Sequence, residues 1–248
     1  GIQVNPTNKN EVPPLLCACE IWRTDIINLL LEKVEDIDVD AAQSDGRTAL
    51  HYACEKGDVS ITETILAKSP NSINSRTTDK KTPIEFACQN ENVEIINLLL
   101  KYIGDTHVNS KFFDGNTILI KACIQQSVDV VKCLLDNTII DINATNNNDK
   151  TALYIIAKNG NEQICQMLLN KEQIDITLTN YRDKTALYEA CKYGNAGIVE
   201  LLLKKGARAD VVTKNGKTPL HVACQHGFYK VVSLLLNQPE VNVNVLTY

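Results

Sequence analysis

Two short segments of this 248-residue chain place a histidine and a cysteine three residues apart, His51-Tyr-Ala-Cys54 and His221-Val-Ala-Cys224. Residues with this spacing share one face of a helix, so each pair could offer two ligands to a zinc ion. A structural zinc site needs four converging ligands, and neither segment supplies more than two. We therefore expect neither a metal site nor a cofactor.

The same cysteines could serve as nucleophiles only beside a base and in a partly exposed, electropositive setting. The other histidines, His107 and His226, stand apart from any such arrangement. A glycine-rich phosphate loop is also missing, because Gly194-Asn-Ala-Gly197 lacks the Lys-Ser or Lys-Thr that would complete it. The expectation is a protein that is not an enzyme. Selective alkylation of one thiol in the folded protein would instead favour a cysteine-dependent enzyme.

Both His and Cys pairs belong to a segment that recurs about every 34 residues and explains their spacing. Its copies begin at Thr48, Thr82, Thr117, Thr151, Thr185 and Thr218, and a degenerate copy begins at Pro13. Counted from the degenerate copy, these are repeats 1 to 7. A fixed period of this length predicts a stack of small units that share one continuous core, and hence one domain.

Each repeat predicts two helices and a connecting loop. The threonine suits a helix N-cap, and Pro83 and Pro219 suit the first helical position. The first helix should end near a glycine, as at Gly57 and Gly160 and likewise at Gly194 and Gly227. The second helix has amphipathic spacing, as in 93–100, 128–135 and 198–203. Repeats 3 and 4 carry Glu91 and Gln126 in place of the glycine, so we expect looser helix ends there.

An asparagine follows the second helix in several repeats, at Asn74, Asn109, Asn143 and Asn244. Asparagine can bond to local backbone and hold a turn. The residues from it to the next threonine read as a hairpin-like finger, with Gly46, Gly115 and Gly216 at one bend. Asn143-Ala-Thr145 fits a glycosylation sequon, which we interpret as structural because Asn143 occupies this turn position.

Six of the nine cysteines share one position of the repeat, Cys19, Cys54, Cys88, Cys123, Cys191 and Cys224. Ala157 fills that position in repeat 5. A small apolar residue there should face the neighbouring helix, so we expect buried thiols. Equivalent residues of adjacent repeats are roughly 10 Å apart, too far for a disulfide. Unpaired thiols in this number indicate a reducing compartment, the cytosol or nucleus.

The composition limits the classes of partner that we expect. The net charge is −5, 44% of residues are hydrophobic and 5% are aromatic. No apolar run reaches the roughly 18 to 20 residues that span a bilayer, so we expect no membrane insertion. Nucleic-acid binding favours a strongly basic chain, which this is not. Residues 1–11 form an N-terminal leader, and Met167 is the only methionine, which is typical of a processed or cloned fragment.

The segment resembles the ankyrin repeat, whose signature is Thr-Pro-Leu-His-x-Ala at a period near 33. Residues 218–223 match it fully, and 48–53 match at all but one position. The resemblance covers residues 12–248 and implies an all-α solenoid of about seven helix-turn-helix repeats with β-hairpin-like fingers. An eighth finger begins at 241–248. It also implies a monomeric scaffold or adaptor that binds proteins through a concave surface made by the fingers and first helices.

Candidate binding residues occupy the positions of that surface that packing leaves open. Those positions are four and five residues before each threonine, and seven and eight after it. The side chains that could anchor a partner, with their basic neighbours, are Phe112, Phe113, Ile124, Tyr181, Arg182, Lys192, Tyr193 and Lys214. Alternatively, Phe113 or Tyr181 packs between adjacent fingers.

A basic column adds a charge preference. It stands just before the threonines, at Arg47, Lys81, Lys150, Lys184 and Lys217, whereas the second helices carry acids. A basic inner face on an acidic chain favours an acidic protein or peptide as partner. Alternatively, the column consists of solvated lysines that members of the family often carry at this position. An alternative is that the chain is the recognition or spacer segment of a larger enzyme, channel or acyltransferase whose activity lies outside it.

Overall fold

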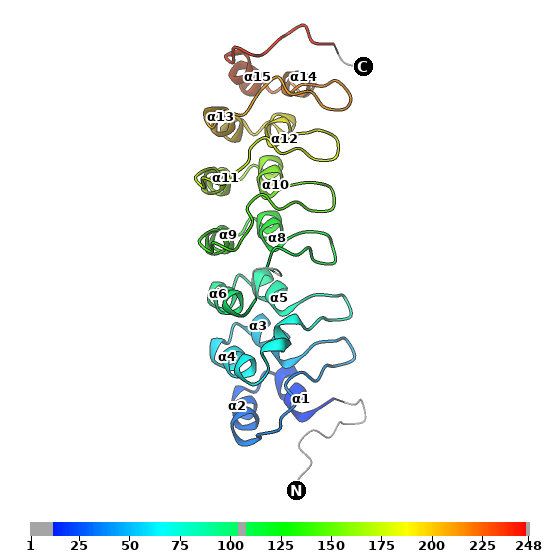
Figure 1. Cartoon of the computed structure of the whole chain (residues 1–248), viewed down its shortest axis with the longest axis vertical. Coiled ribbons are helices and arrows are strands. Elements are labelled where there is room, and N and C mark those ends of the chain that lie inside the picture. The colour runs from blue at the N-terminus through cyan, green and yellow to red at the C-terminus, as the bar shows by residue number, and fades with distance from the viewer. Residues whose placement is uncertain (1–11, 104–107, 247–248) are drawn as a thin grey trace. The chain divides into compact units, whose positions relative to one another are not determined.

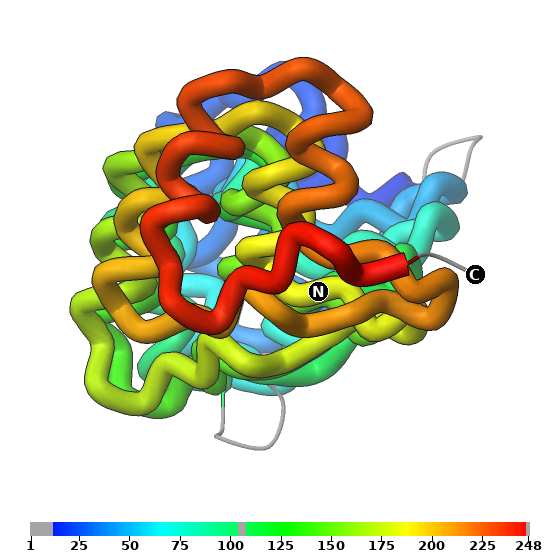
Figure 2. Tube along the Cα trace, turned by 90° about the horizontal axis from the view of Figure 1, so that it is seen from above, coloured from blue at the N-terminus to red at the C-terminus, as the bar shows by residue number. Residues whose placement is uncertain are grey.

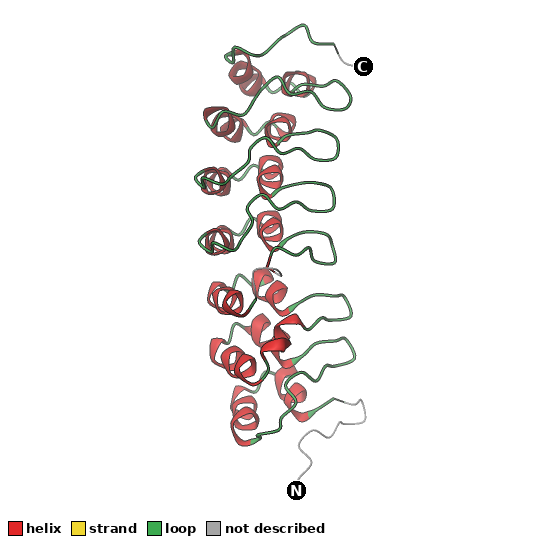
Figure 3. Ribbon diagram, in the orientation of Figure 1, coloured by secondary structure: helices red, strands yellow, loops and turns green. Residues whose placement is uncertain are grey.

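The computed structural model describes residues 12–103 and 108–246, which form helix pairs joined by loops (Figure 3). Contacts between Cα atoms divide the chain into two compact units, one ending at Val108 and one beginning at Asn109. In the described part the extended pairing is limited to two isolated bridges, Ala42 with Thr48 and Thr179 with Thr185. The predicted all-α class is confirmed. The leader at 1–11, His107 and the last two residues lie outside the described residues.

The first unit alternates first and second helices of repeats 1 to 3. Its helices are α1 (Pro14–Glu20), α2 (Thr24–Lys33), α3 (Ala49–Lys56), α4 (Val59–Lys68), the 3-10 turn η1 (Pro70–Asn74), α5 (Pro83–Gln89) and α6 (Val93–Tyr102). The first helices α1, α3 and α5 contact each other in that order, and so do the second helices α2, α4 and α6. The unit therefore has two layers of helices.

The second unit repeats this plan for repeats 4 to 7. Its helices are α8 (Ile118–Gln125), α9 (Val128–Leu135), α10 (Ala152–Asn159), α11 (Glu162–Leu169), α12 (Ala186–Tyr193), α13 (Ala196–Lys204), α14 (Pro219–Gln225) and α15 (Tyr229–Leu236). Figure 1 shows α8, α10, α12 and α14 in one row beside the fingers, with α9, α11, α13 and α15 in the other. Seen from above, the tube of this unit follows the same path in each repeat, from green to red (Figure 2).

The threonines fix where the first helices begin. Every repeat threonine from Thr48 to Thr218 is the N-cap residue of its first helix. The Thr185 hydroxyl, for example, accepts a hydrogen bond from the Tyr188 backbone N–H at 3.1 Å. Pro83 and Pro219 take the first helical position, where their missing N–H leaves no intrahelical bond unmade. The predicted helix starts are confirmed.

The signature histidine ties its own helix start to the next finger. His51 Nδ1 accepts a hydrogen bond from the Thr48 backbone N–H at 3.1 Å. On the other side of the ring, Nε2 lies 3.2 Å from the Lys81 carbonyl oxygen, which is in the next finger. His221 Nε2 contacts the Val245 carbonyl in the same way at 2.9 Å. Both signature histidines, His51 and His221, therefore form hydrogen bonds with backbone groups.

The fingers close on themselves with one recurring backbone bond, from the residue five before the threonine to the residue just before it. In repeat 6 it runs from the Asn180 N–H to the Lys184 carbonyl at 3.0 Å. The finger asparagine acts differently from the prediction. Asn143 accepts a bond from the Asp175 N–H at 2.9 Å and donates to the Gln173 carbonyl at 2.7 Å. It therefore joins consecutive repeats instead of holding a turn within its own.

The expected looser helix ends in repeats 3 and 4 are also corrected. Glu91 and Gln126 adopt the left-handed backbone, with φ of 57° and 59°, that glycine adopts in other repeats. The closing bonds are present in both: the Glu91 N–H donates to the Cys88 carbonyl at 3.2 Å, and the Gln126 N–H to the Cys123 carbonyl at 3.3 Å. These ends carry local strain, since side chains disfavour this region, but the geometry is unchanged.

The shared cysteine position is buried in five of its six occurrences, Cys19, Cys54, Cys88, Cys123 and Cys191. Burial raises the pKa of the Cys19 thiol to about 12 and raises that of Cys54 further. Cys224 contradicts the prediction because it is exposed. Its helix, α14, packs on α12 and α15, and in the described residues no further first helix covers its other side. No disulfide joins any of the nine cysteines.

The fully buried His51 should make folding sensitive to acid. Burial lowers its folded-state pKa from 6.5 to about 4, opposed by the bond to Lys81. As the pH falls, the unfolded chain therefore binds the proton first. The histidine's contribution to stability is complete above pH 6.5 and is lost between pH 6.5 and 4. We expect about 2 to 3 kcal/mol of this loss by pH 4.5 in wild type and none of it in His51→Gln.

Urea unfolding at pH 7 and 4.5 measures this difference. His226→Gln is the matched control, because that histidine is exposed. Equal acid losses in wild type and His51→Gln would refute the assignment.

Close approach of the first helices depends on fully buried alanines such as Ala190. Ala190→Leu should force α12 away from α10 or α14 and cost about 1 to 3 kcal/mol of unfolding free energy. Thermal or urea unfolding checks this, with the exposed Lys205→Leu as a control for added apolar volume. An unchanged midpoint for Ala190→Leu would show that the helix register is wrong.

Candidate functional site

The predicted apolar anchors of the second unit are exposed. Phe113 is 68% exposed, Ile124 47%, Tyr181 44% and Tyr193 42%. Phe113 is the most exposed of the four. Phe112 differs from these exposed residues because it is half-buried. The Lys121 ammonium lies 4.9 Å from the centroid of the Phe112 ring. Phe112 therefore belongs partly to the finger's own packing.

An open cavity of about 660 Å³ lies between the fingers and first helices of repeats 6 and 7. Four of the predicted residues line it: Tyr181, Arg182, Lys192 and Lys214. The remaining lining residues are Lys184, Tyr188, Thr213, Asn215, Lys217, Val222, Gln225 and His226. We call this cavity the cationic pocket. Phe112, Phe113, Ile124 and Tyr193 lie outside it.

Two finger tips supply the outer wall of the cationic pocket. The Arg182 guanidinium lies 5.0 Å from the centroid of the Tyr181 ring, a cation–π contact between neighbouring residues of one finger. Lys214, on the next finger, donates a hydrogen bond from its ammonium to the Tyr181 carbonyl. Backbone also joins the fingers, since the Lys214 N–H donates to the Arg182 carbonyl at 3.3 Å. These contacts link the two finger tips and place Arg182 and Lys214 at the same edge of the cationic pocket.

The inner wall holds cations close to one another. Lys184 lies 3.6 Å from the buried Glu189 carboxylate. Burial lowers the pKa of Lys184, the Glu189 charge raises it, and the positive charges of Lys192 and Arg182 lower it again. Lys217 donates a hydrogen bond to the Gln225 amide oxygen at 2.9 Å. The one buried carboxylate behind the wall thus pairs with Lys184, and Lys184 in turn lies near the positive charges of Lys192 and Arg182.

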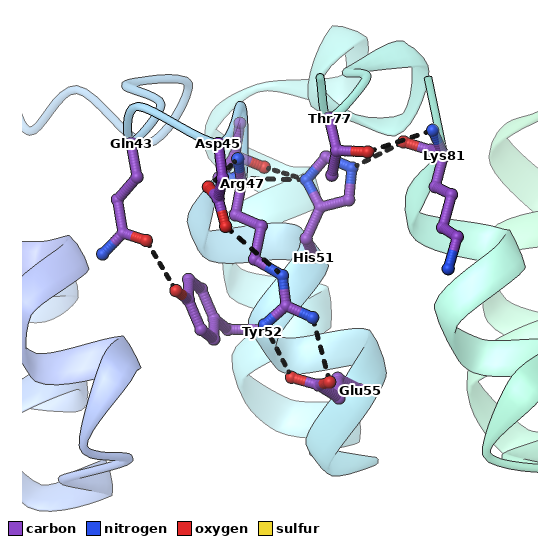
Figure 4. Close-up of polar contacts among 9 residues, drawn as sticks. Gln43, Asp45, Arg47, His51, Tyr52, Glu55, Thr77 and Lys81 are labelled. Carbon is purple, nitrogen blue, oxygen red and sulfur yellow. Dashed lines mark hydrogen bonds and ion pairs between the residues drawn. The ribbon is translucent and has the colours of Figure 1, made fainter. Parts of the chain in front are cut away.

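In the first unit, a residue of the basic column is neutralised by a carboxylate. Arg47 of the basic column makes two hydrogen bonds of 3.0 Å to the Glu55 carboxylate (Figure 4). The guanidinium also lies 5.0 Å from the Tyr52 ring and 4.7 Å from the Phe86 ring. Glu55 stands seven residues after its threonine, and Lys192 stands at that position in repeat 6. Where repeat 2 places a carboxylate, repeat 6 places a cation.

The lining of the cationic pocket accordingly contains five lysines or arginines and no aspartate or glutamate. This arrangement suits binding of an anion. Sequence reasoning missed Tyr188, Val222 and His226 as wall residues. Tyr188 and Val222 stand three and four residues after their threonines, outside the positions chosen as open, whereas His226 stands at a chosen position, eight residues after Thr218.

No three His, Cys, Asp or Glu side chains of residues 12–103 and 108–246 are grouped so that they could hold a metal ion. Within the same ranges, no helix combines the length and apolar character needed to cross a membrane.

Sequence comparison identifies the repeats. The family model for ankyrin repeats matches the chain in three copies, at residues 1–77, 84–180 and 172–246. The chain belongs to the ankyrin-repeat family. Ankyrin domains generally mediate protein–protein interaction and are typically not catalytic. The resemblance seen in the sequence is confirmed.

Solved structures agree on the fold. The crystal structure of the ankyrin repeat domain of Bcl-3, described as a unique member of the IkappaB protein family, is similar with a TM-score of 0.80. The two share 21% sequence identity, over 91% of this chain and 99% of that one. At this identity the likeness concerns the fold alone. A search of curated proteins found no match.

The contrast between Glu55 and Lys192 gives a stability prediction. Lys192→Glu removes a positive charge near Lys184 and supplies the carboxylate that Arg47 has in the first unit. We expect it to stabilise the protein by about 0.2 to 1 kcal/mol at low salt, with the gain shrinking at high salt. Thermal unfolding at two salt concentrations measures this, and Lys192→Gln separates lost repulsion from the new pair. Destabilisation by Lys192→Glu at low salt would contradict the inferred electrostatics.

Proposed function

We propose that the chain is a non-enzymatic scaffold that binds an acidic segment of another protein through the cationic pocket and the surface around it. The observation that carries this proposal is the cluster of five basic side chains in one cavity without a lining carboxylate. Family membership supports a protein as the partner, because ankyrin domains generally bind proteins.

The side chains of the pocket suit carboxylates. Arg182 offers a planar fork of donors that matches a carboxylate in a bidentate manner. Lys192 and Lys217, which also line the pocket, act as point charges. The volume of about 660 Å³ has room for more than one acidic side chain but not for a folded domain. A short acidic stretch of the partner therefore fits better than a broad protein surface.

The remaining features of the proposed role follow from the residues. Buried thiols such as Cys123 and Cys191 suit a reducing compartment, so we place the interaction in the cytosol or nucleus. The net charge of −5 disfavours DNA and RNA, which attract strongly basic chains. The protein would act as a monomer that presents a rigid surface and does no chemistry on its partner.

An acidic peptide should bind the chain in a salt-dependent manner. We expect a fluorescent peptide rich in Glu and Asp to bind with measurable affinity at low ionic strength and about ten-fold or more weakly at high salt. Arg182→Glu combined with Lys214→Glu should reduce the affinity by about ten-fold or more, because it reverses two charges at the pocket edge. Fluorescence anisotropy measures both effects.

Two controls distinguish binding in the pocket from attraction by the overall charge of the protein. Lys204→Glu with Lys205→Glu makes the same change in net charge at exposed positions on and just after α13, and should leave the affinity nearly unchanged. A peptide of the same length with Gln and Asn in place of the acids should not bind. Equal losses from both double variants would show that the attraction is not local to the pocket, and no binding at all would refute the proposed function.

A further inference from the structure

We propose that the partner segment is an extended peptide with two anchors: a cluster of acidic side chains, and a large apolar residue about six to eight positions away. The acidic cluster occupies the cationic pocket, and the apolar residue contacts Phe113 and Ile124 in repeat 4. This proposal rests on the proposed function and specifies the kind of peptide that would satisfy it.

The apolar anchor site is placed by the repeat register. Phe113 holds the finger position that Tyr181 holds in repeat 6, four residues before the threonine. Ile124 holds the helix position of Lys192, seven residues after it. Because Tyr181 and Lys192 line one cavity, the equivalent Phe113 and Ile124 lie on the same side of the second unit. Both are exposed, so repeat 4 presents apolar surface where repeats 6 and 7 present charge.

The side chains between these two sites are polar. Repeat 5 has Asn147 at the finger position and Lys158 at the helix position. The Lys158 ammonium lies 5.6 Å from the centroid of the Tyr193 ring, so the cationic character already begins there. The surface thus becomes more basic from repeat 4 to repeats 6 and 7, where the lysines and Arg182 lie beside the exposed Tyr181 and Tyr193. A ligand complementary to it must be apolar at one end and acidic at the other.

The spacing of the first helices sets the distance between the anchors. In the second unit α8 packs on α10, α10 on α12 and α12 on α14. With about 8 to 10 Å between packed helices, repeat 4 and the pocket between repeats 6 and 7 are roughly 20 to 25 Å apart. An extended chain advances about 3.3 to 3.6 Å per residue, so about six to eight residues cover this distance. The peptide would run across the first helices, from finger to finger.

Peptides with one phenylalanine, a Gly-Ser linker and a Glu-Glu-Asp-Glu cluster test this spacing. Linkers of about two, about six and about twelve residues, each in both chain orders, would be compared with the acidic cluster alone by fluorescence anisotropy. In at least one order, we expect the middle linker to bind about ten-fold more tightly than the acidic cluster alone, since the second contact becomes intramolecular. The shortest linker cannot reach and should give no gain.

Variants of the apolar site provide the second readout. Phe113→Ser with Ile124→Ser changes two exposed residues and should abolish the gain from phenylalanine while leaving binding of the acidic cluster unchanged. The matched control is Leu236→Ser with Val243→Ser, two exposed apolar residues on and after α15, outside the proposed surface. That control should bind both kinds of peptide as wild type does.

The outcomes distinguish this proposal from the proposed function. If all linkers bind no more tightly than the acidic cluster alone, or if Phe113→Ser with Ile124→Ser keeps the gain, the two-anchor proposal is overturned and the acidic pocket stands. If the acidic cluster fails to bind with or without phenylalanine, both proposals fail. A gain that is greatest at the middle linker and lost in the repeat 4 variant supports the two anchors.

Discussion

Close contact between consecutive first helices is the constraint on which both units depend. The helices can approach because the facing positions hold residues as small as Ala53, Ala122 and Ala190, each fully buried. Their burial leaves each first helix no freedom to turn, so the residue seven positions after the threonine has a fixed direction in every repeat. Finger tips are fixed in the same way by the backbone bond at their base. Exposed residues such as Phe113 and Ile124 can therefore vary with little effect on the packing of the helices.

The repeating part of the fold was predictable from the sequence because its causes are local. A threonine caps the helix that follows it, and an apolar stripe marks a second helix, whatever the rest of the chain does. The exposed candidates Phe113, Ile124 and Tyr181 were found by register alone, since a repeat tells which positions packing uses. Register did not distinguish Phe112 from Phe113, although Phe112 is half-buried and lies beside Lys121.

Interactions between repeats were not predictable in this way. Asn143 bonds to backbone in the following repeat, and nothing near Asn143 in the sequence distinguishes that partner from a local one. The cationic pocket has the same origin, because its walls come from two repeats and a buried carboxylate, Glu189, lies behind one of them. Glu55 and Lys192 occupy the same position of repeats 2 and 6. The difference in their charge matters because Glu55 forms hydrogen bonds with Arg47, which the structure shows and the sequence does not. Pairings of this kind between repeats can be recognised only when the positions of the repeats in space are known.

The exposure of Cys224 has a practical consequence. Among the nine cysteines, all within the described residues, it alone is exposed, whereas burial suppresses ionisation of thiols such as Cys54 and Cys191. Selective alkylation of one thiol would therefore report accessibility and not a catalytic cysteine. It would also provide a route to site-specific conjugation without mutagenesis. Cys224 immediately precedes Gln225 and His226 in the sequence, so a dye attached there would label the end of α14 whose residues line the cationic pocket.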